Sequence, residues 1–125
     1  PYTTLFRSIH IIDFHAEATG EKISFAHAVE GKASAVIGTH THVQTRDYRI
    51  TENGLAYISD VGMTGLYDGV LGFDKDSVTN KLIYGDNKPF KVPEEGKGLL
   101  SGVIIDVDNL SGKAQEIFPI YYVEE

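Results

Sequence analysis

Two short apolar runs with a helical pattern between them constrain this chain more than any other feature. Residues 9–14 (IHIIDF) and 33–38 (ASAVIG) have the length and the β-branched content of strands buried on both faces. Between them, residues 19–31 (TGEKISFAHAVEG) place apolar side chains near helical spacing and end on a glycine, with Thr19 as a candidate cap. A strand–helix–strand unit crosses over right-handed and sets its strands parallel. The sequence therefore predicts an α/β fold.

The rest of the chain indicates antiparallel additions to that unit. Residues 47–51 and 55–59 flank the turn signal ENG and predict a hairpin. The glycine-rich segment 60–72 predicts an ordered loop without regular structure, and residues 73–85 predict a helix that begins at one of its aspartates. From residue 89 onward, alternating apolar residues and the turn NLSGK predict antiparallel strands joined in a C-terminal hairpin.

Composition limits the classes of function. A chain of 125 residues is the usual size of one domain with its own core. Eighteen acidic and eleven basic residues give a net charge of −7, which argues against an extended nucleic-acid surface or an anionic membrane as partner. The absence of cysteine excludes disulfides and thiolate chemistry and fits a cytoplasmic protein. No apolar run approaches the roughly 18 residues of a membrane span.

The first eight residues, PYTTLFRS, match the translation of a common sequencing adapter and lead without a turn into residues 9–14. We expect residues 1–8 to be foreign, and residues 9–125 to be the C-terminal part of a single domain whose gene was cut at this point. The alternative is a natural strand followed by a turn, which composition does not exclude.

Three histidines follow the two predicted parallel strands. His15 comes directly after the first, and His40 and His42 come directly after the second in the segment GTHTH. Carboxyl ends of adjacent parallel strands meet at one edge of a sheet, where α/β folds place their sites. If the second segment is extended, His40 and His42 point to the same side. The three imidazoles then predict a metal site, against the alternative of surface histidines that cluster by chance.

Three carboxylates are candidates for orienting those histidines or for facing the substrate. Asp13 lies one residue before the end of the first strand, and Glu17 is equally consistent with a charge at the start of the helix. Asp60 follows residues 55–59 as His40 follows its own strand, although an aspartate that serves its own turn would look the same.

Three segments in order, DFHAEAT (13–19), GTHTHVQT (38–45) and ISDVGMTGLYDGVLGFD (58–74), resemble the C-terminal half of the YmdB-like branch of calcineurin-type metallophosphoesterases. The resemblance implies a four-layer α/β/β/α sandwich and metal-dependent hydrolysis of a small phosphodiester such as a 2',3'-cyclic nucleotide. It also implies a dinuclear centre of iron, manganese or similar ions, with His15 and His40 on one ion and His42 on the other.

The chain departs from the family pattern in one respect. The family's remaining ligands and its general acid, a histidine after an asparagine, belong to an N-terminal half, and this chain has no Asn-His pair. We therefore expect no catalytic residue here, and we expect the chain alone to be inactive and prone to form a homo-oligomer through exposed apolar surface. Two alternatives stay open: a non-catalytic metal-binding or interaction module, and a metal-dependent amidohydrolase.

Overall fold

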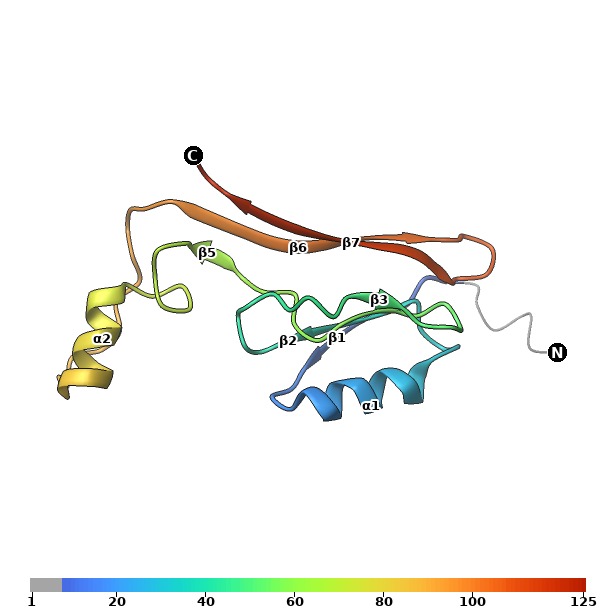
Figure 1. The fold of residues 1–125 in the computed structure, drawn as a ribbon, viewed down its shortest axis with the longest axis horizontal. Coiled ribbons are helices and arrows are strands. Elements are labelled where there is room, and N and C mark those ends of the chain that lie inside the picture. The colour runs from blue at the N-terminus through green and yellow to red at the C-terminus, as the bar shows by residue number, and fades with distance from the viewer. Residues whose placement is uncertain (1–7) are drawn as a thin grey trace.

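The computed structural model describes residues 8–125, so the prediction that residues 1–8 are foreign lies almost wholly outside the described residues. Within residues 8–125 there are two helices and seven strands, and Figure 1 shows their arrangement. In chain order they are β1 (Ile11–His15), α1 (Thr19–Val29), β2 (Ala35–Thr39), β3 (Arg49–Ile50), β4 (Ala56–Ile58), β5 (Thr64–Leu66), α2 (Lys75–Tyr84), β6 (Gly98–Val107) and β7 (Ala114–Val123).

The first sheet has the strand order β1-β2-β4-β3. Strands β1, β2 and β4 are parallel, and β1 pairs with β2 from Ile11 opposite Ala35 to His15 opposite Thr39. Strand β3 is antiparallel to β4 and closes the short hairpin around ENG. The predicted strand–helix–strand unit and this hairpin are therefore confirmed. The register places the ends of β1 and β2 level with each other, which brings the segments after them to one rim.

Helix α1 covers one face of this sheet (Figure 1). Its apolar side packs on a buried cluster that includes Val36, Leu55 and Tyr57, and the rings of Phe14 and Phe25 stack with centroids 4.2 Å apart. The expectation that Thr19 caps the helix is wrong. The capping position is Ala18, which has no side-chain oxygen to accept a hydrogen bond, and Thr19 is already helical.

The second sheet, β5-β6-β7, is antiparallel and lies against the face of the first sheet that α1 leaves open (Figure 1). Ala35 and Ala56 of the first sheet pack there on Ala114 and Ile117 of β7. The C-terminal hairpin is confirmed. The prediction that residues 60–72 lack regular structure is wrong at β5, because Thr64–Leu66 pairs with Leu100 to Gly98 of β6.

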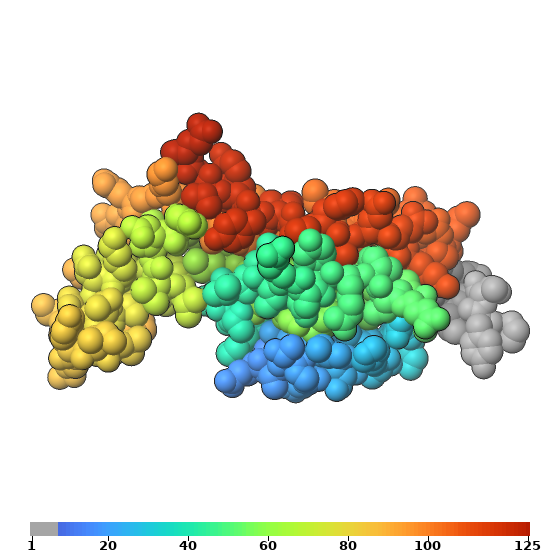
Figure 2. All heavy atoms as spheres, viewed as in Figure 1, coloured from blue at the N-terminus to red at the C-terminus, as the bar shows by residue number. Residues whose placement is uncertain are grey.

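Helix α2 begins where its sequence predicts, since the Asp74 carboxylate accepts a hydrogen bond from the Ser77 amide at 2.8 Å. It ends at Gly85, which has the left-handed conformation common at helix ends. The helix and its flanking loops form a lobe at one end of the elongated molecule (Figures 1 and 2). Neither helix among residues 8–125 is long and apolar enough to cross a membrane.

Candidate functional site

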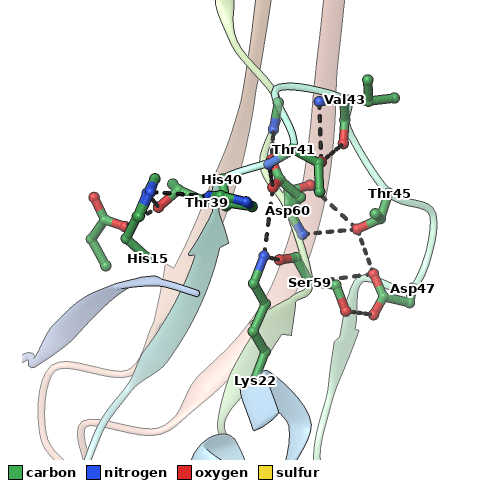
Figure 3. A network of polar contacts seen from close by, with 12 residues as sticks. His15, Lys22, Thr39, His40, Thr41, Val43, Thr45, Asp47, Ser59 and Asp60 are labelled. Atoms are coloured by element: carbon green, nitrogen blue, oxygen red, sulfur yellow. Dashed lines mark hydrogen bonds and ion pairs between the residues drawn. The ribbon is translucent and has the colours of Figure 1, made fainter. Parts of the chain in front are cut away.

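His15 and His40 meet at the rim where β1 and β2 end (Figure 3). His15 is the last residue of β1, and His40 follows the last residue of β2. The His15 Nε2 and His40 Nδ1 atoms are 3.3 Å apart, and the two rings meet edge to face with centroids 5.1 Å apart. Both side chains are exposed. The parallel pairing of β1 and β2 thus brings together two histidines that helix α1 and its loops separate in the sequence.

A hydroxyl fixes the proton on His15. The Thr39 Oγ1 donates its one proton to Asp13 Oδ1 at 2.8 Å and lies 3.1 Å from His15 Nδ1. Since that proton is already engaged, the hydroxyl can only accept from His15, so the Nδ1 of His15 carries hydrogen. The lone pair of His15 is therefore on Nε2, the atom that faces His40. Asp13 thus acts on His15 through Thr39, a residue whose role the sequence did not indicate.

His42 lies differently from the extended arrangement that the sequence predicted. The backbone φ angles of His40 and His42 are 140° and 67°, both in the region that side chains rarely adopt, so the segment GTHTH is not a continued strand. The His42 Nδ1 lies 3.4 Å from the carbonyl oxygen of Leu71 in the loop before α2. A carbonyl only accepts, so this contact puts the proton on Nδ1 and leaves the lone pair on Nε2.

The carboxylate of Asp60 holds this segment through hydrogen bonds from two backbone amides. Its Oδ2 accepts the Thr41 amide at 2.7 Å, and its Oδ1 accepts the Gly62 amide at 2.9 Å. The carboxylate thus serves its own turn and also reaches the peptide between the two histidines. Glu17 lies in the exposed bend between β1 and α1, ahead of the first helical turn.

Two further residues of the site escaped the sequence analysis. Lys22 of α1 is 2 % exposed, and its ammonium donates to the Ser59 carbonyl oxygen at 2.9 Å. The sequence did hold a signal that Lys22 is buried. It lies four residues before Ala26, which is also buried, and residues with this spacing share one face of a helix. Gly38 approaches Ser59 so closely that a side chain has no room, since a Cβ there would lie 1.8 Å from the Ser59 oxygen.

Asp47 ties the far end of the same loop to the end of β4. It accepts hydrogen bonds from the Ser59 amide at 3.1 Å, from the Ser59 hydroxyl at short range, and from the Thr45 hydroxyl at 2.6 Å. Burial alone would raise the pKa of the Asp47 carboxyl, but the hydrogen bonds from Ser59 and Thr45 outweigh it and lower that pKa. The loop that carries both histidines is therefore anchored at Asp60 and again at Asp47.

The distance between the facing nitrogens of His15 and His40 matches that of two ligands on one metal ion, and it also matches a hydrogen bond between the two rings. Nitrogens each about 2.0 to 2.1 Å from a shared ion are roughly 3.0 Å apart at right angles and roughly 3.4 Å apart in a tetrahedral site. The observed 3.3 Å falls within that interval. Within residues 8–125, however, no three histidine, aspartate or glutamate side chains gather as a complete ligand set would. The common metal role of His15, His40 and His42 therefore stays a prediction.

Comparison with known proteins gives a consistent result. A family model described as YmdB-like protein matches residues 3–120. A Bacillus subtilis protein named 2',3'-cyclic-nucleotide 2'-phosphodiesterase is 53 % identical over 107 residues, which cover 85 % of this chain and 40 % of that protein. The chain thus spans less than half of this relative's length.

Two solved structures each contain a region that superposes on this chain. One, described as a novel phosphatase from Mycoplasma pneumoniae, superposes with a TM-score of 0.85 at 39 % identity and covers 94 % of this chain and 42 % of that one. The other, a hypothetical protein from Thermus thermophilus, gives a TM-score of 0.84 at 35 % identity and covers 94 % and 45 %.

Proposed function

Because the chain belongs to the family of YmdB-like proteins, we propose that it is the C-terminal part of a metal-dependent phosphodiesterase. The proposed substrate is a small phosphodiester of the 2',3'-cyclic nucleotide class, as the name of the Bacillus subtilis relative suggests. The observation that carries the proposal is the 3.3 Å separation of His15 Nε2 and His40 Nδ1 at an exposed rim. A hydrogen bond from His40 Nδ1 to His15 Nε2 gives the same separation, and metal binding by the full-length protein distinguishes the two interpretations.

In this proposal, His15 and His40 hold one ion, and His42 offers its Nε2 to a second. Bound iron or manganese ions would supply the positive charge that stabilises the developing charge on the phosphoryl oxygens. The residues of this chain supply orientation. Thr39 and Asp13 keep the proton of His15 on Nδ1, and the Leu71 carbonyl keeps that of His42 on its own Nδ1, so both Nε2 lone pairs are available.

The same proposal assigns the remaining ligands and the general acid to residues outside this chain. Residues 9–125 would be the C-terminal part of one four-layer α/β/β/α domain, and the 40 to 45 % coverage of the relatives supports a longer parent protein. Two histidines on one ion and one on another leave both coordination shells incomplete. We therefore expect the chain alone to bind metal weakly and to hydrolyse nothing.

Hydrolysis by the full-length protein encoded by the same gene tests this proposal. We expect that protein, loaded with Mn²⁺, to hydrolyse bis-p-nitrophenyl phosphate and 2',3'-cyclic AMP. His15→Ala and His40→Ala should each lower kcat at least about 100-fold, as the loss of a group acting on the transition state does. His27→Ala is the matched control, because His27 is a 62 % exposed residue of α1 outside the site. Full activity of both site variants would remove these residues from the mechanism.

The alternative of a metal-dependent amidohydrolase predicts a barrel of repeated βα units. Residues 8–125 instead form a mixed four-stranded sheet and a separate antiparallel sheet. The alternative of a non-catalytic metal-binding module shares the histidine geometry, and the hydrolysis assay separates it from the phosphodiesterase.

A further inference from the structure

Lys22 is a cation buried beneath the histidine segment. It rises from the inner face of α1 toward the rim of the sheet (Figure 3). Its Nζ lies 2.9 Å from the Ser59 carbonyl oxygen and 3.6 Å from Asp60 Oδ2, and the two charged side chains are 2 % and 1 % exposed. A buried charge is costly unless it is paired and hydrogen-bonded. Here the two charges pair with each other, while Lys22 donates its hydrogen bond to the Ser59 carbonyl oxygen and Asp60 accepts from the Thr41 and Gly62 amides.

Within residues 8–125, the Asp60 carboxylate contacts the Thr41 amide, the Gly62 amide and the Lys22 ammonium. Oδ2 receives the Thr41 amide and faces Lys22, while Oδ1 receives the Gly62 amide. The backbone of Asp60 is also held, since its amide donates to the Thr45 hydroxyl and its carbonyl oxygen accepts the Thr45 amide, each at 3.0 Å. Because both of its oxygens already contact protein groups, this carboxylate is a poor metal ligand, but it can hold the backbone of the histidine segment in place.

The peptide that Asp60 anchors lies between the two histidines of GTHTH. Both flanking residues have positive φ angles, 140° at His40 and 67° at His42. Such conformations cost free energy in residues with a side chain and persist only where the surroundings impose them. The hydrogen bond from the Thr41 amide to Asp60 Oδ2, 2.7 Å long, imposes this backbone conformation, because it fixes the peptide group between His40 and His42.

We propose that Lys22 and Asp60 form a buried positioning pair that sets the geometry of the two histidines of GTHTH. Asp60 holds the Thr41 peptide, and Lys22 balances the charge of Asp60 from within the protein and ties it to α1. The pair thereby fixes His40 Nδ1 opposite His15 Nε2 and turns His42 toward the Leu71 carbonyl. Lys22 and Asp60 touch neither metal nor substrate. The inference rests on the proposed function only in taking the histidines as ligands.

Zinc affinity of the full-length protein, measured by isothermal titration without substrate, tests the pair. The informative variant is Lys22→Met/Asp60→Asn, because it removes both charges together and leaves no unpaired buried charge. The Thr41 and Gly62 amides contact different oxygens of Asp60, and asparagine replaces one of those oxygens with an NH2 group that only donates, so one of the two amides loses its acceptor. We expect the double variant to fold and to bind zinc about 10- to 100-fold more weakly, the usual effect of losing a residue that orients ligands. Lys32→Met, at an exposed lysine after α1, is the control.

Hydrogen exchange at the Thr41 amide is the second readout, and it needs neither metal nor substrate. In the unsubstituted protein we expect this amide to exchange slowly although Thr41 itself is exposed, and we expect the double variant to lose that protection. Wild-type zinc affinity in the folded double variant would overturn the proposal. If the variant does not fold, rapid Thr41 exchange in the unsubstituted protein would overturn it. A protein that binds zinc but hydrolyses no phosphodiester would refute the proposed function alone.

Discussion

At the scale of single residues, the site depends on hydrogen bonds that decide where protons lie. Thr39 has one hydroxyl proton, and its donation to Asp13 forces His15 to donate from Nδ1. The sequence could predict that His15 and His40 share a rim, because strand ends follow from apolar runs. It could not predict the relay through Thr39, because that depends on which face of β2 the side chain occupies at its last residue.

The first prediction concerns this hydroxyl. Thr39→Val keeps the shape and the β-branched character of the side chain but leaves His15 Nδ1 without an acceptor. We expect the zinc affinity of the full-length protein to fall about 10-fold, while the free energy of unfolding changes by no more than about 1 kcal/mol. Calorimetric titration and urea unfolding measure the two quantities. Thr64→Val, at an exposed position of β5, should change neither, and equal zinc affinity of Thr39→Val and the unsubstituted protein would contradict the relay.

The second prediction concerns the closest backbone approach in the site. A Cβ at Gly38 would lie 1.8 Å from the Ser59 oxygen and 2.5 Å from the Ser59 carbonyl carbon, both of them backbone atoms that cannot turn aside. Gly38→Ala should therefore cost at least about 3 kcal/mol of the free energy of unfolding. Gly20→Ala is the matched control, because nothing lies within 4 Å of its added methyl and alanine favours helix. Similar urea midpoints for the two variants would contradict this account.

At the scale of elements, the local patterns predicted β1, α1, β2, the ENG hairpin, α2 and the C-terminal hairpin. What they missed depends on contacts distant in sequence. Strand β5 has three residues in a glycine-rich segment, and only its pairing with β6 makes it a strand. The segment after β2 has positive φ angles because Asp60, distant along the chain, holds the Thr41 amide. Asp47, within the same loop, ties it to Ser59 after β4.

The third prediction is a pH effect at the loop between β2 and β3. The folded-state pKa of Asp47 lies below its ordinary value of 3.8, so its carboxylate stabilises the fold fully above that value. This stabilisation is lost as the pH falls through the lower folded-state pKa. Asp47→Asn should thus be less stable than the unsubstituted protein near neutral pH, and the difference should shrink between about pH 5 and about pH 2. Urea unfolding across that range measures it, and a constant difference would contradict the assignment.

At the scale of the whole molecule, the described residues leave apolar surface uncovered. The face of the β6–β7 hairpin that points away from the first sheet carries four side chains that are 46 to 57 % exposed, namely Leu100, Ile104, Phe118 and Tyr122. Among residues 8–125, strand β1 pairs with β2 alone and lies at the edge of its sheet. Exposed apolar patches and unpaired edges favour association.

The fourth prediction follows from this surface. The chain of 125 residues, studied by itself, should associate with rising concentration in sedimentation velocity experiments. Ile104→Lys/Phe118→Lys places charges on two residues that pair directly across the hairpin, and it should shift the chain toward monomer. Gln115→Lys, at an exposed polar position of β7, is the control and should not. A chain that stays monomeric throughout would show that this face needs no cover.

The most direct measurement of the central claim is an anomalous difference map from crystals of the full-length protein grown with zinc. The account predicts a peak within about 2.0 to 2.3 Å of both His15 Nε2 and His40 Nδ1, the distance of a zinc–nitrogen bond with allowance for coordinate error. A map with no peak between these two nitrogens, or with zinc bound to His42 and neither of them, would contradict it.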